Sequence, residues 1–155
     1  MNGLPNPDFT GLTFVKGHGT ENDFVLYADP DGVLPMDAQT AAWMADRRRG
    51  IGADGVIRAV RTSAADEIVA GLGVEAFEAD WFMDYRNADG SVAEMCGNGA
   101  RVFVEFLQAA GLADLPEGKC MPIATRGGVR QVWREGHNYA VDMGKWTFPT
   151  DSSTP

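Results

Sequence analysis

The apolar residues of the chain recur with helical spacing in one stretch and with strand-like spacing in several others. The helical stretch begins near residue 97, and from Val102 to Ala110 its apolar residues return every three or four positions. Gly111 follows directly, at a position where helices commonly end. This pattern predicts a helix over residues 97–110 with one strongly apolar face. The residues on that face are Val102, Phe103, Phe106, Leu107 and Ala110.

Short runs rich in β-branched and aromatic residues, bounded by turn-forming residues, predict the strands. We expect strands at residues 12–15, 24–27, 56–60, 81–86, 121–125, 128–134 and 139–143. The first two are expected to pair as a hairpin around a polar, glycine-rich loop at residues 16–23. Residues 62–80 are acidic and rich in alanine, which indicates a loop or a short helix between strands.

A second helix is expected to run from Asp37 to about Arg48. Asp37 can cap its N-terminus, but Thr40 stands where a capping box needs Glu or Gln. The basic residues Arg47, Arg48 and Arg49 favour the carboxyl end of a helix, where they complement its dipole. We interpret these arginines as solvated surface and not as a nucleic-acid patch.

These elements together predict an α+β fold, in which a mostly antiparallel, strongly curved sheet wraps around the 97–110 helix. The chain has 155 residues, which is enough for one domain with a sizeable core. Residues 1–11 are expected to form a flexible arm, and residues 150–155 resemble the start of a linker.

The net charge and the hydropathy of the sequence restrict the partners and the cellular compartment that we expect. The formal net charge of −9 argues against nucleic acid or an anionic membrane as a partner. The sequence has no apolar run long enough to span a bilayer, and its N-terminus lacks the features of a signal peptide. We therefore expect a cytoplasmic protein whose two cysteines, Cys96 and Cys120, form no structural disulfide.

Cys96 stands at the point where the apolar helix begins, after the strong turn sequence NADG at residues 87–90 and within the sequence CGNG. The first N–H groups of a helix lack internal partners, and the helix dipole makes that end electropositive. A carboxylate can dock there, and the same field stabilises a thiolate. The alternative is a buried cysteine before an ordinary helix, but the flanking turn and glycines favour a reactive thiol.

Other candidate chemistries are weaker. Residues 50–55 match the G-x-G-x-x-G pattern, but a helix is expected before them and a strand after them, the reverse of a dinucleotide site. The cysteines and histidines lack the spacing of a zinc site, and the sequence indicates no cofactor. Cys120, His18 and His137 are interpreted as structural or exposed. The amide of Asn22 can donate to and accept from a zwitterion, although a turn-forming role is an alternative.

Three stretches resemble motifs of the diaminopimelate epimerase family. They are NADGSVAEMCGNGAR at residues 87–101, HGTENDF at residues 18–24 and RGIGADG at residues 49–55. Their order and approximate spacing also match, and the resemblance extends from about residue 14 to about residue 148. It corresponds only to the first half of such an enzyme.

The resemblance implies cofactor-independent epimerisation of LL- to meso-diaminopimelate for lysine and cell-wall synthesis. In that family two cysteines, one from each of two similar domains, act as base and acid across a cleft, and Cys96 matches the first. Gly97 and Asn98 match residues that bind the substrate carboxylate, and Asn22 and Asn87 match asparagines that contact the substrate. Many members carry Gln at the position of Gly55, so a polar contact from that position is lost here.

The second cysteine is missing, because no further cysteine–glycine helix start follows Cys96 and Cys120 cannot replace it. We therefore hypothesise that the chain is the N-terminal domain of a two-domain epimerase, that it needs the second domain as partner and that it is inactive alone. One alternative is a non-catalytic binding or assembly module, which includes a homodimer. Another is a related amino-acid racemase or isomerase of the same fold.

Overall fold

The computed structural model describes residues 8–34, 36–94 and 96–145. Its strands are β1 (Val15–Gly19), β2 (Asn22–Ala28), β3 (Gly55–Arg61), β4 (Trp81–Asn87), β5 (Cys120–Thr125), β6 (Gly128–Glu135) and β7 (Asn138–Val141). Its helices are α1 (Ala38–Ala45), α2 (Asp66–Val69) and α3 (Gly97–Ala109), with 3-10 turns η1 (Thr62–Ala64) and η2 (Val74–Glu78).

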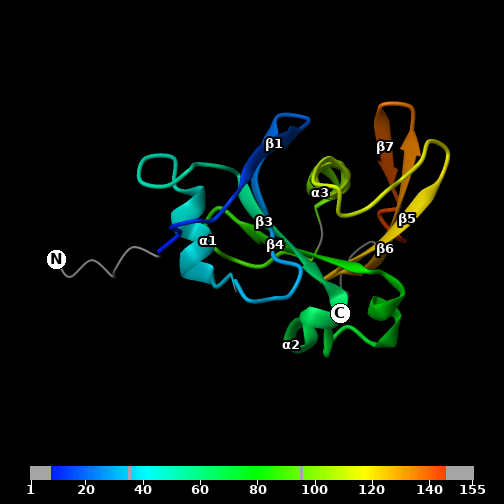
Figure 1. Ribbon diagram of the computed structural model, residues 1–155, viewed down its shortest axis with the longest axis horizontal. Coiled ribbons are helices and arrows are strands. Elements are labelled where there is room, and N and C mark those ends of the chain that lie inside the picture. The colour runs from blue at the N-terminus through cyan, green and yellow to red at the C-terminus, as the bar shows by residue number, and fades with distance from the viewer. Residues whose placement is uncertain (1–7, 35, 95, 146–155) are drawn as a thin grey trace, which may run out of the picture.

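The described strands form one seven-stranded sheet in the order of the sequence, β1 to β7. The pairs β2–β3 and β4–β5 are parallel, and the other neighbouring pairs are antiparallel. In Figure 1 the sheet curves into a U, and α3 lies inside it between the edge strands β1 and β7. The predicted α+β fold, a mostly antiparallel curved sheet around the central helix, is confirmed.

The concave side of the sheet and α3 enclose the largest apolar cluster. The predicted apolar face of α3 turns to the sheet in part. Phe103 and Leu107 are fully buried there, Val104 is buried with them although it was not predicted, and Ala110 is exposed. From the sheet, Leu26 and Ile57 meet this helix in the same cluster. Because Phe103 and Leu107 recur four residues apart, a helix presents both to one surface, and their burial fixes α3 in the curve of the sheet.

The convex side carries two smaller apolar clusters. One lies beneath α1 and contains Val25, Val56 and Met44, and the other lies beneath α2 and η2 and contains Val60 and Phe82. Figure 1 shows α1 and α2 outside the U, on the opposite side of the sheet from α3. Residues of the same strand alternate between these clusters and the α3 cluster, as a sheet covered on both faces requires.

The first hairpin differs from the prediction of a strand at residues 12–15 and a loop at residues 16–23. Strand β1 covers Val15–Gly19, and only Thr20 and Glu21 lie between it and β2. Gly17 and Gly19 were predicted as loop residues, but they pair with β2 as strand residues. Helix α3 approaches both closely, since a Cβ on Gly17 or Gly19 would lie 2.8 or 3.0 Å from the Val102 side chain. Glycine in a strand interior is a known sign of such a close approach.

The second helix begins as predicted and ends earlier. Asp37 caps α1, and its Oδ1 accepts a hydrogen bond of 2.7 Å from the Thr40 N–H. The helix stops at Ala45 because Asp46 is extended and its carboxylate accepts from the N–H groups of Arg48 and Arg49, which closes a turn. The prediction that the arginines complement the α1 dipole is therefore wrong, since they lie beyond its last turn.

The remaining segments are short. Of the predicted arm at residues 1–11, residues 8–11 are described, and Phe9 packs against the Trp43 ring with centroids 5.1 Å apart. Residues 62–80 contain η1, α2 and η2, which agrees with the expected short helical segment. The predicted linker at residues 150–155 lies outside the described residues. No helix of the described residues has the length and hydropathy to cross a membrane.

Candidate active site at the start of α3

Cys96 is the N-cap of α3. Its backbone is extended, and its Sγ accepts a hydrogen bond of 3.3 Å from the N–H of Gly99. The side chain is partly exposed, so the sulfur is held by the first turn of the helix without being enclosed. A Cβ on Gly99 would lie 3.3 Å from this sulfur, and one on Gly97 would lie 3.0 Å from Sδ of Met143. The small residues thus leave room around the thiol and the first helical N–H groups.

Asn98 lies in the first turn of α3, beside the β1–β2 hairpin. A Cβ on Gly19 would lie 3.2 Å from the Asn98 carbonyl oxygen, so the hairpin and the helix start are in contact. Arg101, one turn further along α3, donates to Oδ1 of Asn98 and, at 3.2 Å, to the hydroxyl of Thr20. Arg101 therefore fastens the turn of the hairpin to the helix start.

Asn22 opens β2 opposite Gly19. Its side chain is partly exposed and makes no hydrogen bond to another described residue, so its donors and its acceptor are available to a ligand. The next residue, Asp23, anchors this end of the strand: its carbonyl accepts from the N–H of Asp54 at 2.9 Å, and its own N–H donates to the Asp54 carboxylate at 3.1 Å. The HGTENDF and RGIGADG segments are thereby joined.

Asn87 closes β4 and begins the tight NADG turn. The turn is closed by the Gly90 N–H, which donates to the Asn87 carbonyl at 2.9 Å, and Gly90 has a φ of 85° that favours glycine. Ala88 donates its N–H to the carbonyl of Asp54 at 3.0 Å. Asp54 consequently links the strand end that carries Asn22 to the turn that carries Asn87.

Tyr85 lies beside Asn87, and the sequence analysis did not single it out. Its hydroxyl donates to Oδ1 of Asn87 at 2.8 Å, and its ring meets Phe24 edge-on. Burial, followed by electrostatic repulsion from Cys96, raises the pKa of Tyr85 to about 12. Strand periodicity was the available signal, because residues 85 and 87 of one strand point to the same face.

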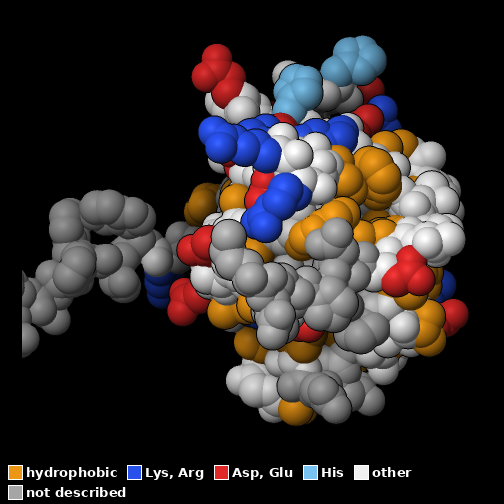
Figure 2. All heavy atoms as spheres, turned by 90° about the vertical axis from the view of Figure 1, so that its left-hand side faces the viewer, with side chains coloured by type: hydrophobic (Ala, Val, Ile, Leu, Met, Phe, Trp, Pro, Cys, Tyr) orange, Lys and Arg blue, Asp and Glu red, His pale blue; other side chains and the backbone are white. Residues whose placement is uncertain are grey.

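An ion-pair cluster stabilises the loops on one side of the site. Asp23 pairs with Lys16 at 2.7 Å and with Arg47 at 2.7 Å, and Arg47 also reaches Asp54 at 3.1 Å. The two hydrogen bonds from the Arg47 guanidinium are the main reason that the pKa of Asp23 is far below its usual value. Figure 2 shows Lys, Arg, Asp and Glu side chains close together on the face that carries α1.

Some of the site residues predicted from the sequence therefore lie together, and others do not. Gly97 and Asn98 share the first turn of α3 with Cys96, and the hairpin that bears Asn22 lies against this turn. Asn87 joins them indirectly, through Tyr85 and through the backbone of Asp54. Among the described residues, no hydrogen bond connects Asn22, Asn87 and Cys96 directly, so a ligand would have to bridge them.

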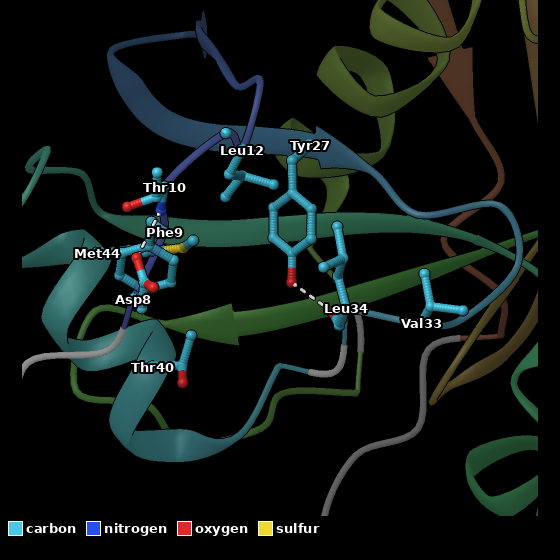
Figure 3. Close-up of a pocket in the computed structure, with 10 residues that line it drawn as sticks. Asp8, Phe9, Thr10, Leu12, Tyr27, Val33, Leu34, Thr40 and Met44 are labelled. Carbon is cyan, nitrogen blue, oxygen red and sulfur yellow. Dashed lines mark hydrogen bonds between the residues drawn. The ribbon is translucent and has the colours of Figure 1, made fainter.

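Other positions lie apart from this cluster or at its edge. Cys120 is exposed at the start of β5. His137 is exposed in the β6–β7 turn, where it lines a shallow cavity together with Gly19 and Arg101. A mostly apolar cavity of about 300 Å³ lies between the N-terminal segment, α1 and Tyr27 of β2, whose hydroxyl donates to the Leu34 carbonyl (Figure 3). No residue of the three motifs lines it. Among the described residues, no three His, Cys, Asp or Glu side chains gather to hold a metal ion.

The curved sheet around a central helix defines a fold class with solved members. A phenazine biosynthesis protein of the PhzF family from Bacillus anthracis is similar with a TM-score of 0.52 and 17% identity, over 77% of this chain and 34% of its own. A hydroxyproline epimerase from Agrobacterium vitis is similar with a TM-score of 0.50 and 14% identity, over 83% of this chain and 39% of its own. At these identities the likeness concerns the fold alone.

Sequence comparison identifies the family within this class. The family model for diaminopimelate epimerase matches residues 14–149. The diaminopimelate epimerase of Thermobifida fusca is 57% identical over 134 residues, which cover 86% of this chain and 48% of the relative. That of Streptomyces coelicolor is 49% identical over 141 residues, which cover 90% and 46%. The chain belongs to the diaminopimelate epimerase family, and it spans about half the length of these curated relatives.

Proposed function

We propose that this chain supplies one of two acid–base cysteines for the cofactor-independent epimerisation of LL- to meso-diaminopimelate. The single observation that carries the proposal is the position of Cys96 as the N-cap of α3, with a helical N–H donated to its sulfur at 3.3 Å. The substrate is taken from the names of the relatives. The second cysteine is proposed to come from the part of the relatives that this chain does not span.

The chemistry requires two groups on opposite faces of the α-carbon. A base removes the proton, and an acid on the other face returns one, because reprotonation from the same side would restore the starting stereoisomer. Cys96 as a thiolate is suited to one of these positions, since the unpaired N–H groups and the dipole at a helix start stabilise a negative charge. One cysteine alone cannot invert the centre, and we therefore expect the isolated chain to be inactive.

Substrate binding is proposed to use the remaining groups of the cluster. The backbone N–H groups at Gly97 and Asn98 belong to the first turn of α3 and suit a carboxylate. The free amide of Asn22 and the amide of Asn87 suit the ammonium and carboxylate groups of an amino acid. In this arrangement the carboxylate and the thiolate share the positive end of one helix.

The test is an epimerase assay with the chain alone and with the second half of a relative joined to it or added in trans. Conversion of LL- to meso-diaminopimelate is followed by chiral chromatography, with exchange of the α-proton in D₂O as a second readout. We expect activity only when both halves are present, and a loss of about 10²-fold or more in Cys96→Ala. The matched control is Cys120→Ala, which should retain activity. Turnover that survives Cys96→Ala would refute the role of Cys96.

A further inference from the structure

Three side-chain hydrogen bonds form a continuous chain along the NADG turn. The Tyr85 hydroxyl lies 2.8 Å from Oδ1 of Asn87, Nδ2 of Asn87 lies 3.0 Å from Oγ of Ser91, and Oγ of Ser91 lies 2.5 Å from Oδ1 of Asp89. The proposed function uses only Asn87 of these four residues. The other three hold its amide from both ends.

The direction of each of these three hydrogen bonds is fixed by the last residue of the series, Asp89. An ionised carboxylate only accepts, and the hydrogen bonds from Ser91 lower the pKa of Asp89, so Asp89 stays ionised at neutral pH. The Ser91 hydroxyl must then donate to Asp89 and accept from Asn87. This sets the Asn87 NH₂ group toward Ser91 and its oxygen toward Tyr85, which must therefore be the donor.

Tyr85, the donor at the start of this series of hydrogen bonds, is held firmly by its neighbours. Tyr85 is only 8% exposed, and its ring occupies the space beside Gly55, where a Cβ would lie 2.5 Å from Cε2 and 3.1 Å from the hydroxyl oxygen. The ring also meets Phe24 at a centroid distance of 6.0 Å. The absence of a side chain at Gly55 thus makes room for a hydroxyl group that reaches Asn87.

We propose that Tyr85 is a positioning residue that, together with Ser91 and Asp89, locks the Asn87 amide in one orientation for a zwitterionic amino-acid substrate. This inference rests on the proposed function. Asn87 uses one of its two N–H groups for Ser91 and one of its two oxygen lone pairs for Tyr85. One N–H donor and one oxygen lone pair of Asn87 remain in fixed positions for the substrate. An amide that could flip would exchange the positions of its NH₂ group and its oxygen.

The first experiment tests the hydrogen-bond chain without reference to activity. The side-chain NH₂ resonances of Asn87 are assigned in ¹⁵N-labelled protein with Asn87→Asp and are then compared among variants. Ser91→Ala and Tyr85→Phe are each expected to shift this NH₂ pair, and Ser91→Thr, which keeps the hydroxyl, is expected to restore it. Tyr139→Phe is the matched control, since it removes a tyrosine hydroxyl that bonds Glu105 elsewhere. Unchanged Asn87 resonances in both Tyr85→Phe and Ser91→Ala would overturn the proposal.

The second experiment tests the positioning role in the two-half protein of the epimerase assay. Tyr85→Phe and Ser91→Ala should each raise KM for diaminopimelate about three- to tenfold and change kcat less than about twofold, because a misoriented amide weakens ground-state and transition-state binding alike. Ser91→Thr should restore KM, and Tyr139→Phe should leave it unchanged. An active wild type whose KM is unaffected by Tyr85→Phe would overturn the role of Tyr85. An inactive wild type would instead contradict the proposed function, while the resonances of Asn87 still decide whether the chain of hydrogen bonds exists.

Discussion

Gly55 and Tyr85 are complementary at the level of single residues. Gly55 pairs with Asn87 across β3 and β4, and the Tyr85 ring fills the space above it. The sequence comparison with the family predicted a lost polar contact at residue 55, because the Gln of many members is absent. The hydroxyl oxygen of Tyr85 lies 3.1 Å from the position that a Cβ of residue 55 would take. Tyr85 is thirty positions further along the chain, so no local pattern around Gly55 could indicate this contact.

A substitution at this position should therefore be costly. In Gly55→Ala the new Cβ would lie 2.5 Å from the Tyr85 ring and 2.9 Å from the carbonyl oxygen of Arg86, and backbone cannot move aside as a flexible side chain can. We expect a loss of about 1–3 kcal/mol in the free energy of unfolding, measured with urea. Gly71→Ala is the control, since a Cβ there meets nothing within 4 Å and should change stability little. Equal stabilities of the two variants would contradict this packing.

The sequence predicted the position of Cys96 better than the contacts of Tyr85. Cys96 was correctly predicted at the start of the central helix, because apolar spacing, the turn and the glycines all converge on that position. For Tyr85 the sequence analysis predicted only that it lies in a strand. Its contact with Asn87 follows from the two-residue period of a strand, but its hydrogen bond depends on the space left by Gly55, which belongs to a separate strand.

At the level of elements, ion pairs of Asp23 add to the backbone ladder that holds the β1–β2 hairpin. Asp23 binds Lys16, Arg47 and Asp54 through side chains and backbone, and these contacts tie β2 to the loop after α1. The sequence analysis placed Arg47 on a solvated surface, where its side chain does lie, and within the second helix, which is wrong. The error has a physical cause, since the helix ends early at the Asp46 turn and releases Arg47 to reach Asp23.

This arrangement predicts a pH dependence of stability. The pKa of Asp23 is lowered in the folded state, chiefly by Arg47, so the native state favours the ionised form more than the unfolded chain does. Its contribution is fully present above the unfolded value of about 3.9 and is lost progressively as the pH falls from that value through the lower pKa of the folded state. Asp23→Asn should therefore lower the free energy of unfolding by about 1 kcal/mol at pH 7 and by less at pH 3.

Urea unfolding at pH 7, 5 and 3 measures this difference. The control is Asp31→Asn, which changes an exposed aspartate without an ion pair among the described residues. A difference between wild type and Asp23→Asn that stays constant from pH 7 to pH 3 would show that the charge of Asp23 does not contribute.

At the level of the whole molecule, the convex side of the sheet contains a buried ionic network between its two apolar clusters. Arg58 pairs with Asp29 at 3.1 Å and with Asp84 at 2.9 Å, and all three side chains are nearly inaccessible. Arg126 lies 2.8 Å from the second oxygen of Asp84 but is too poorly aligned to hydrogen-bond to it, so that oxygen is paired by charge alone. The network joins β3, β4 and the segment after β2 on the side of the sheet opposite α3.

Removal of the central cation should strongly destabilise the fold. Arg58→Met leaves the buried carboxylates of Asp29 and Asp84 without their main partner, and we expect a loss of about 3–5 kcal/mol in the free energy of unfolding. Arg61→Met is the matched control on the same strand, because Arg61 is exposed and stacks on Trp81 at 5.1 Å, a contact worth about 1 kcal/mol or less. A loss in Arg58→Met no greater than in Arg61→Met would contradict the importance of the network.

The overall architecture could be predicted from the sequence in its main features. The apolar face of residues 102–110 predicted the central helix, and the strand-like runs predicted the curved sheet around it. The parallel pairing of β2 with β3 and of β4 with β5 was not predicted. It depends on the path of the crossover connections that contain α1 and α3. The buried ionic network of Arg58, Asp29 and Asp84 was not predicted either. Its residues come from distant segments, and each resembles an ordinary strand or turn residue in the sequence.

The reactivity of Cys96 relative to Cys120 tests the central claim most directly, since both thiols are in the same molecule. The folded chain is treated with a limiting amount of iodoacetamide at pH 7, and mass spectrometry measures the rate at each cysteine. Accessibility alone favours Cys120, which is exposed, over Cys96, which is partly buried. If the start of α3 stabilises the thiolate, Cys96 reacts about tenfold faster or more, and the two rates converge when the chain is unfolded in guanidinium. Faster labelling of Cys120 in the folded chain, or a ratio that unfolding does not change, would contradict the account.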